Sequence, residues 1–364
     1  MKSFTLKERY FPISHGVIHA VVDASTVMVI FSATVVHNLA PHQIAFMICG
    51  YDLLAFAGQA ILGLGIDKLR LYKSVILTGI AFTVISVLLM LTYPFVAMIM
   101  ASLGNALFHV GAGAVALNTN PGRAADAGMF VAPGALGLAV GSWLGKGGNT
   151  ALWPFLLVLL LSLVITLKSN LPIVAPSSSH GNVSIKGAFA ILSLWLVSIS
   201  IRAFVGFAGA HECPKLPLIS FGLAFAAFGG KACGGIISDR LGWIRTSVGA
   251  LLLSAPLIAL GSSYSSIIML GMFFFQMTMP VTLTAVWALM PGKPAFSFGL
   301  CSLALVLGAF AAFYEPWAVY YNAPVFIALI TLSAVSIFAA LNSLKEFESV
   351  NYVVASECAN GDLQ

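Results

Sequence analysis

The strongest constraint on the fold is a series of apolar runs, each long enough to cross a lipid bilayer. A helix rises about 1.5 Å per residue, so about 20 apolar residues span the hydrocarbon layer. Of the 364 residues, 60% are hydrophobic and 8% are charged, a balance that a soluble core cannot accommodate. We therefore predict an all-α membrane protein with twelve transmembrane helices, in the windows 14–37, 42–65, 74–92, 95–118, 127–146, 150–168, 187–209, 217–238, 246–262, 264–290, 297–320 and 323–344.

The connections between these windows are short, with one exception near the middle of the chain. Residues 169–186 contain two prolines and three consecutive serines, and they divide the windows into six and six. We expect a cytoplasmic N-terminal tail at 1–11, a six-helix bundle at 12–168, a cytoplasmic linker at 169–186, a second six-helix bundle at 187–344 and a cytoplasmic tail at 345–364. The polar composition of the last tail predicts disorder.

The positions of the cations predict the orientation in the membrane. With the N-terminus inside, thirteen of the seventeen Lys and Arg residues fall in cytoplasmic segments, as the positive-inside rule requires. We therefore place both termini in the cytoplasm and the protein in the inner membrane of a bacterium. The net charge of +5 follows from this topology, and we expect no nucleic-acid partner.

One short pattern occurs twice: a Gly, three apolar or small residues, an Asp and a cation, between two apolar windows. The two copies are Gly63, Asp67 and Lys68, and Gly235, Asp239 and Arg240, at an offset of 172 positions. Pro-Gly-cation sequences at 121–123 and 291–293 follow the fourth and tenth windows, 170 positions apart. The similar offsets indicate two parallel repeats of six helices, an arrangement found in transporters.

These loops resemble the G-x-x-x-D-[RK]-x-G-[RK]-[RK] signature of the major facilitator superfamily. The second copy keeps Asp239, Arg240 and Gly242, whereas the first has Arg70 in the glycine position. The resemblance implies two pseudo-symmetric six-helix bundles around a central cavity, which opens to the two sides of the membrane in turn. It also implies that each Asp faces a neighbouring helix N-terminus, where the helix dipole favours an anion, and thereby keeps the cytoplasmic side closed.

A narrower similarity is to the fosmidomycin-resistance type of drug exporter. It rests on His19-x-x-x-Asp23 in the first window, Phe-His at 108–109 in the fourth, and regularly spaced glycines in the fifth. The chain departs from that group at 110–111, where Val-Gly replaces Pro-Glu. This similarity implies proton-coupled efflux.

Ionisable residues inside a membrane are costly and generally face a cavity or a pathway. Apart from Lys168, which ends the sixth window and is counted as cytoplasmic, the third, sixth, ninth and twelfth windows contain none. The others contain His15, His19, Asp23, Asp52, His109, Arg202, Lys231 and Glu315. In the facilitator fold the four empty windows are those that face outward, so the resemblance implies that these side chains lie around the central cavity.

His15, His19 and Asp23 are spaced by four residues and share one face of a helix. We hypothesise that Asp23 and His19 carry the coupling proton, because a carboxylate and an imidazole buried together can exchange one. One alternative is a structural role for Asp23, paired with Arg202 or Lys231. A divalent-metal site on this helix face is another, but clustered cysteines and an H-E-x-x-H motif are absent, and we predict no metal.

The remaining candidates belong to the substrate cavity or to its support. Arg202 and Lys231 suit an anionic substrate, although Arg202 could also extend towards the membrane surface. Asp52 is a candidate for a structural ion pair, with Lys231 as its partner. The list of cavity candidates is completed by Asn105, His109 and Gln276, of which His109 could equally be a hydrogen-bonded group between helices.

The sequence therefore predicts a secondary active transporter that exports a small organic molecule by proton-coupled antiport. A uniporter, or a proton symporter for uptake of a small polar or anionic metabolite, is the alternative in the same class. A non-transporting receptor or scaffold on the same fold is the alternative outside it. Nucleotide-binding, zincin and serine-hydrolase motifs are absent, so we expect neither an enzyme nor a cofactor. The expected partners are the substrate, the proton and the lipid bilayer, and the expected state is a monomer.

Overall fold

The computed structural model describes residues 10–171, 185–211, 216–261, 264–314, 318 and 321–361, and within them it contains helices and no strand. The first half comprises α2 (Phe11–Val36), α3 (Pro41–Asp52), the π-helical turn η1 (Leu53–Ala57), α4 (Gln59–Leu69), α5 (Tyr72–Leu89), α6 (Pro94–Thr119), α7 (Ala124–Lys146) and α8 (Trp153–Lys168). The second half comprises α9 (Ile185–His211), α10 (Pro217–Leu241), α11 (Trp243–Leu260), α12 (Ser265–Gln276), α13 (Met279–Leu289), α14 (Pro294–Ala312) and α15 (Ala323–Gly361).

The number of spans agrees closely with the sequence prediction. Within the described residues, eleven helical segments are long and apolar enough to cross a membrane, and α8 is a shorter apolar helix of 16 residues. Several spans begin at a proline, whose fixed φ suits the first turn and whose missing N–H costs nothing there. The prediction of an all-α membrane fold is confirmed.

The structure differs from the sequence prediction at the interior of two spans and at the end of two others. The second span is interrupted by η1, and the tenth is broken between α12 and α13. Helix α14 ends at Ala312, before the expected end at 320. We expected a disordered tail after 344, but helix α15 continues to Gly361. The helix can continue because no Pro or Gly interrupts the chain between 345 and 360. Most of the predicted linker, the start of the N-terminal tail and Glu315 lie outside the described residues.

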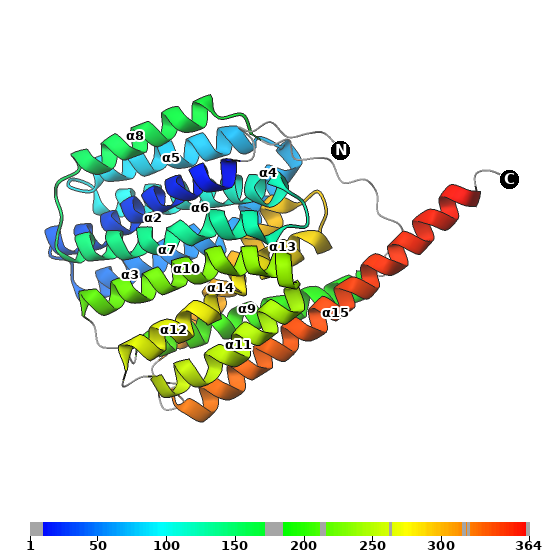
Figure 1. Ribbon diagram of the computed structural model, residues 1–364. Coiled ribbons are helices and arrows are strands. Elements are labelled where there is room, and N and C mark those ends of the chain that lie inside the picture. The colour runs from blue at the N-terminus through cyan, green and yellow to red at the C-terminus, as the bar shows by residue number, and fades with distance from the viewer. Residues whose placement is uncertain are drawn as a thin grey trace.

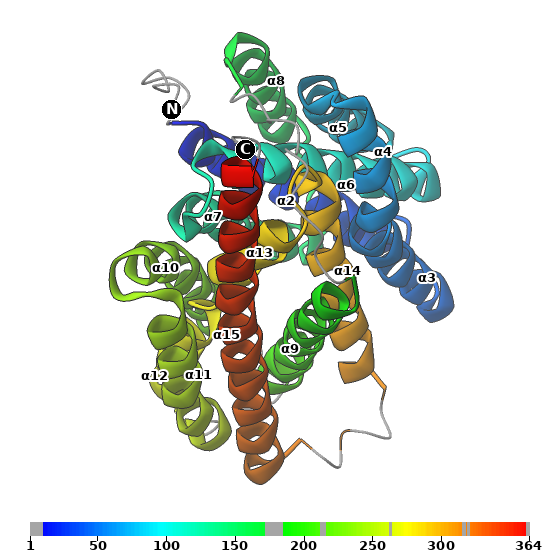
Figure 2. The same cartoon turned by 90° about the vertical axis from the view of Figure 1, so that its right-hand side faces the viewer.

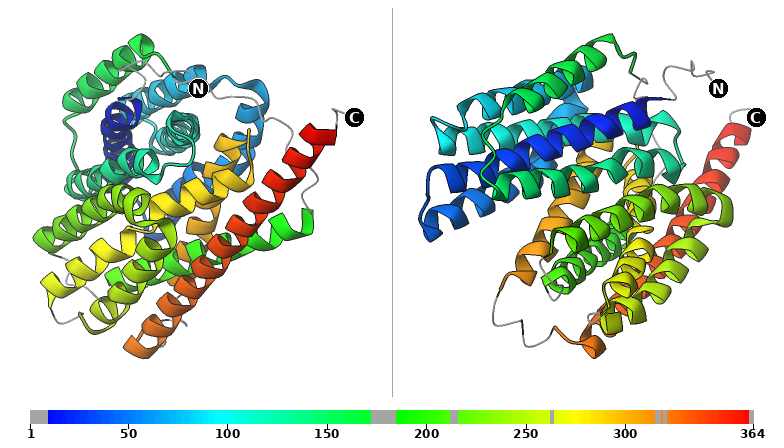
Figure 3. Two further views of the ribbon diagram at one scale, coloured as in Figure 1. Left: turned by 45° about the vertical axis from the view of Figure 1, so that its right-hand side comes forward. Right: turned by 60° about the vertical axis from the view of Figure 1, so that its left-hand side comes forward.

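The helices form two bundles, α2–α8 and α9–α15 (Figure 2). Helix α2 begins and α15 ends at the same end of the molecule (Figure 1). Within the first bundle α2 packs along α7 and α5 along α6, and within the second α11 packs along α15 and α14 along α9 (Figure 3).

The two bundles meet mainly through two helix pairs, α7 with α10 and α4 with α14. Glycines allow these backbones to touch. A Cβ at Gly235 would lie 2.6 Å from the carbonyl oxygen of Ala124, and one at Gly63 would lie 2.6 Å from that of Ala295. Small residues at helix crossings permit close van der Waals packing where there is no hydrophobic driving force. The first glycine of each repeated motif is therefore a contact point between the bundles.

The second glycine position of the motif is conformationally demanding in both copies. Gly242 has φ +95°, and Arg70, which stands in the equivalent place, has φ +57°. A left-handed backbone costs a side-chain-bearing residue roughly 1–2 kcal/mol. The departure of the first copy from the signature is thus a point of backbone strain at the end of α4.

We expect Arg70→Gly to stabilise the protein by about 1 kcal/mol, because glycine adopts the left-handed conformation without that cost. Gly242→Ala should destabilise it by about 1–3 kcal/mol for the opposite reason. Thermal unfolding of the purified protein in detergent measures both changes. Lys68→Gly, within the helical part of α4, is the control and should be destabilising. An Arg70→Gly variant that loses as much stability as Lys68→Gly would contradict the assignment of strain.

Candidate functional site

A cavity of about 490 Å³ lies between the two bundles. Its described lining comes from α2, α3, η1, α6 and α7 on one side, and from α9, α10, α12, α13 and α14 on the other; none of it comes from α5, α8, α11 or α15. The lining extends along α2 from His19 to Phe31 and along α14 from Phe298 to beyond its end at Phe313. Both directions lead away from the C-terminal ends of α4 and α10, where Asp67 and Asp239 lie.

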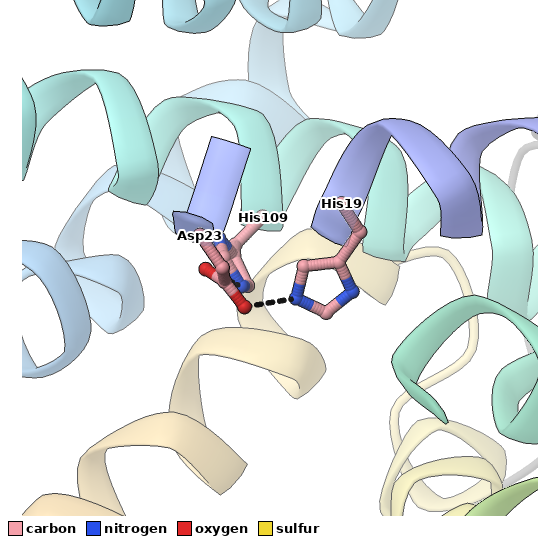
Figure 4. A group of neighbouring side chains, drawn as sticks. All are labelled: His19, Asp23 and His109. Atoms are coloured by element: carbon pink, nitrogen blue, oxygen red, sulfur yellow. Dashed lines mark ion pairs between the residues drawn. The ribbon is translucent and has the colours of Figure 1, made fainter. Parts of the chain in front are cut away.

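The innermost polar group of the cavity is a cluster of His19 and Asp23 from α2 with His109 from α6 (Figure 4). The Nε2 atom of His19 lies 3.1 Å from Oδ2 of Asp23, and Nε2 of His109 lies 3.5 Å from Oδ1. All three residues are at most 5% exposed. Both imidazoles thus approach the two oxygens of one carboxylate.

A second set of polar groups holds the Asp23 carboxylate in place. The Asn105 side-chain amide donates to Oδ1 of Asp23 at 2.9 Å and to Oγ1 of Thr26 at 3.3 Å. The Thr26 hydroxyl also lies 3.0 Å from the Tyr51 hydroxyl. The sequence predicted Asn105 as a substrate-cavity residue, whereas in the described structure it is not among the lining residues and holds Asp23 instead. Thr26 and Tyr51 were not predicted, although Thr26, three residues after Asp23, lies on the adjacent part of the same helix face.

The hydrogen bonds of the two imidazoles indicate their tautomers. Nδ1 of His19 lies 2.9 Å from the carbonyl oxygen of Phe130, and Nδ1 of His109 lies 2.9 Å from that of Asn105. A carbonyl oxygen can only accept, so each Nδ1 carries a hydrogen. In a neutral imidazole the other nitrogen, Nε2, then presents a lone pair to Asp23.

Helix α7 approaches this cluster through a glycine. A Cβ at Gly134 would lie 2.6 Å from Nε2 of His19 and 2.8 Å from Oδ2 of Asp23. The absence of a side chain here lets the imidazole and the carboxylate occupy the space between α2 and α7. The glycine spacing noted in the sequence therefore serves the cluster as well as the packing of helices.

The cluster differs from the helix stripe expected from the sequence. His15 lies apart, stacked on Phe11 with ring centroids 3.9 Å apart, and His109 takes its place beside Asp23. One possible ligand atom from each of His19, Asp23 and His109 lies within 4.8 Å of those of the other two. Two imidazoles and one carboxylate can bind a proton, and the same set of ligands suits a divalent cation.

The second bundle contributes Lys231 from α10 and Gln276 from α12 to the cavity, and the first bundle adds Asp52 from α3. The side chains of Asp52 and Lys231 are partly exposed. Among the described residues the salt bridges are His19–Asp23, His109–Asp23 and Arg123–Asp239. The structure therefore does not contain the Asp52–Lys231 ion pair that we expected.

Arg202 does not line the cavity in the described structure. Its guanidinium donates to the hydroxyls of Thr278 and Thr282, and its Nε donates to the carbonyl oxygen of Ser198. Thr278 lies in the break between α12 and α13. The buried cation thus joins α9 to the interrupted tenth span, and this structural arrangement differs from the substrate contact that the sequence suggested.

The two aspartates of the repeated motif make equivalent contacts across the bundle interface. Asp67 accepts hydrogen bonds from the backbone N–H groups of Ala295 and Phe296 at 3.0 and 2.8 Å. Asp239 accepts from those of Ala124 and Ala125 at 2.8 and 2.9 Å. Each carboxylate satisfies unpaired donors at a helix N-terminus, of α14 or of α7, where the dipole also favours a negative charge.

The neighbours of the two aspartates differ. Asp67 also accepts from the Tyr72 hydroxyl at 2.9 Å, whereas Asp239 accepts from the Trp243 indole at 3.3 Å and lies 3.7 Å from Arg123. The motif cations Lys68 and Arg240 are exposed and make no hydrogen bond or ion pair with the described residues.

Comparison with solved structures gives long matches at low sequence identity. The E. coli fucose:proton symporter matches with a TM-score of 0.70 and 12% identity, over 92% of this chain and 98% of that chain. The human organic anion transporter MFSD10 matches with a TM-score of 0.64 and 14% identity, over 94% and 100%. A bacterial homologue of the iron transporter ferroportin, in an outward-facing state, matches with a TM-score of 0.57 and 15% identity, over 93% and 99%.

No family model and no curated protein sequence matches the chain. The structural matches nevertheless cover almost the whole chain, and one of them is described as a major facilitator superfamily transporter. The protein is therefore a multi-pass, all-α membrane protein with the fold of major facilitator superfamily transporters. The narrower similarity to fosmidomycin-resistance exporters stays a prediction.

Removing one acceptor from Arg202 should destabilise the protein. We expect Thr278→Val to cost about 1.5–3 kcal/mol, because a buried guanidinium loses a hydrogen bond without a change in side-chain volume. Thr284→Val is the matched control, since the Thr284 hydroxyl is equally buried but donates only to Pro280 of its own helix. Thermal unfolding in detergent compares them. Equal melting temperatures for the two variants would show that the Arg202 contact contributes nothing to stability.

Proposed function

We propose that the protein is a proton-coupled secondary transporter for a small organic molecule, working by alternating access between its two bundles. The observation that carries the proposal is the convergence of two imidazole Nε2 atoms on the Asp23 carboxylate at the inner end of the cavity. The fold agrees with such a function, since the similar solved structures include a fucose:proton symporter.

The tautomers explain why this cluster is suited to a proton. With both Nδ1 atoms donating to carbonyl oxygens, neutral His19 and His109 would turn lone pairs towards a carboxylate that also offers only lone pairs. One added proton, on an imidazole or on Asp23, converts this repulsive contact into a hydrogen bond. The cluster therefore favours the uptake of one proton, and the adjoining cavity provides a route for its exchange.

The alternative of a purely structural Asp23 finds less support. That alternative requires a fixed cation such as Arg202 or Lys231 as the partner of Asp23, and neither forms a salt bridge with it in the described part of the chain. Arg202 is engaged by Thr278 and Thr282 instead. The partners of Asp23 are two titratable imidazoles and a neutral amide, a set that permits a change of protonation.

Asp67 and Asp239 supply the gate in this proposal. They join the bundles at one end, and the cavity extends towards the other end. The described state is therefore closed at the end where Asp67 and Asp239 lie. Opening on that side requires the four hydrogen bonds from the N-termini of α7 and α14 to break. With the orientation expected from the cations, this closed side is cytoplasmic.

The coupling can be antiport, as the resemblance to exporters implies, or symport. Which of the two occurs depends on the charge of the substrate. A cationic substrate would compete with the proton for Asp23, which produces exchange, whereas an anionic substrate would favour the protonated cluster, which produces cotransport.

Proton uptake by the cluster can be tested before the substrate is known. We expect the infrared carboxyl C=O band of the purified protein to include a component that appears and disappears with pH, and Asp23→Asn should remove it. Asp52→Asn is the matched control, because Asp52 lines the same cavity without an imidazole partner, and it should leave that component in place. A pH-dependent component that survives Asp23→Asn would contradict the assignment.

Transport itself requires proteoliposomes with an imposed pH gradient, in which internal pH is followed while candidate compounds are added. We expect a subset of compounds to change the internal pH, and this response should be lost in Asp23→Asn and reduced in His19→Ala. Measurements with and without a chelator separate a proton from a divalent cation at the cluster. The proposal fails if no compound moves protons, or if the Asp23→Asn, His19→Ala double variant retains the response.

Asp67→Ala should open the closed end of the molecule more often. It removes two charge-assisted hydrogen bonds between the bundles, each worth about 1.5–3 kcal/mol. Spin labels on cysteines introduced by Lys68→Cys and Lys293→Cys, in a background without native cysteines, should show an added population at longer distance. Asp126→Ala is the control, because Asp126 accepts from Asn120 within the first bundle. Identical distance distributions for the two variants would exclude a gating role for Asp67.

A further inference from the structure

Lys231 is a cation without a partner in the middle of the membrane-spanning region. It is the one Lys or Arg among the described residues that line the cavity. It makes no hydrogen bond or salt bridge with any described residue. A charged ammonium in such a position is costly unless a counter-charge compensates it. The structure therefore presents a positive charge that a ligand could neutralise.

The carboxylates of the cavity do not fill that role. Asp23 is shared between His19, His109 and the Asn105 amide, and Asp52 does not reach salt-bridge distance. Lys231 and Asp23 line the same cavity from opposite bundles and form no salt bridge with each other. A bound anion would thus lie between the unpaired cation of the second bundle and the proton site of the first.

The backbone at Lys231 is held firmly in place. A Cβ at Gly128 of α7 would lie 2.7 Å from the Lys231 carbonyl oxygen and 3.2 Å from the ring of Pro280. This contact belongs to the interface between α7 and α10 that also contains Asp239. The position of the Lys231 backbone is therefore coupled to the packing of the two bundles.

The rest of the cavity suits an apolar body. Its walls carry aromatic side chains from both bundles, namely Phe31, Phe56, Phe207, Phe298, Phe310 and Phe313. Gln276 adds an amide whose hydrogen bond is a weak contact of 3.6 Å to the sulfur of Met272. A cavity of about 490 Å³ falls within the range of small-molecule sites, roughly 300–1,000 Å³. Apolar walls around one cation favour a small organic anion with an aromatic or similarly apolar body.

We propose that the substrate is a small amphipathic organic anion, whose charged group binds Lys231 while its apolar body lies among the cavity phenylalanines. This inference rests on the proposed proton-coupled transport and adds the relative direction in which substrate and proton move. A negative charge between Lys231 and the His19–Asp23–His109 cluster favours protonation of the cluster, and by linkage a protonated cluster binds the anion more tightly. Anion and proton therefore move in the same direction, as cotransport.

A set of probes with one ring system and three charges tests the binding step. Naphthalenesulfonate, neutral naphthalenesulfonamide and cationic naphthylmethylammonium are added to the purified protein in detergent, and thermal stabilisation gives their affinities. We expect the sulfonate to bind best. Lys231→Gln should weaken it about tenfold or more, as the loss of a charge-assisted contact implies, whereas Lys231→Arg should retain binding.

Lys168→Gln is the matched control, because it removes the same charge from an exposed position at the end of α8. It should leave the affinity for the sulfonate unchanged. Preferential binding of the ammonium or the amide, absence of sulfonate binding, or equal losses in Lys231→Gln and Lys168→Gln would each overturn the proposal.

Proteoliposomes test the sign of coupling with the same sulfonate, which stays charged and carries no proton across the membrane by itself. We expect uptake of the sulfonate to be accompanied by internal acidification, and both should be lost in Lys231→Gln. Binding without proton movement would refute the proposed proton coupling but support the anion site. Proton movement driven by the ammonium probe would refute the anion site and leave proton coupling intact. Alkalinisation during sulfonate uptake would overturn cotransport.

Discussion

The arrangement of this protein depends on how a few carboxylates are satisfied where water is scarce. A buried charge without partners is costly, so each buried carboxylate needs hydrogen-bond donors or counter-charges. Three aspartates obtain such partners in two different ways. Asp67 and Asp239 accept hydrogen bonds from helix N-termini of the opposite bundle, so their solvation is also a contact between the two halves. Asp23 is instead held by two imidazoles and the Asn105 amide within one bundle, and in the proposed mechanism this cluster binds a proton. The hydrogen bonds of Asp67 and Asp239 fix the relative position of the two bundles, whereas the surroundings of Asp23 permit a change of charge.

The separation of these two tasks suits an alternating-access transporter. The proposed proton site at Asp23 and the unpaired Lys231 lie in the cavity on opposite bundles, while the aspartates that join the bundles lie towards its closed end. In the proposed transport cycle, a change of charge in the cavity can therefore shift the equilibrium between the closed and open states. It does so without directly changing the hydrogen bonds of Asp67 and Asp239 that stabilise the closed state. Helices α7 and α10 connect the two regions, because the same pair carries Gly128, Lys231 and Asp239.

The sequence predicts what depends on composition and spacing, and fails where contacts depend on three-dimensional approach. Apolar length defines the spans, and His19 and Asp23 four residues apart on one helix predict their pairing. The position of His109 beside them cannot be derived from spacing, because it comes from another helix. The expected Asp52–Lys231 pair is absent for the same reason, since shared depth in the membrane does not ensure contact. Arg202 illustrates a third limit: a cation can be satisfied by buried neutral hydroxyls at and just after a helix break that the apolar pattern did not reveal.

The two connections between the bundles are not equally robust. One is anchored at Gly242, where glycine accepts a positive φ at little cost, and Arg123 lies 3.7 Å from its aspartate, Asp239. The other is anchored beside Arg70, which holds a strained backbone next to Asp67. In the proposed opening, we therefore expect the contact between α4 and α14 to separate before the contact between α7 and α10. The pair α7 and α10 would then act as the hinge about which the two bundles move apart.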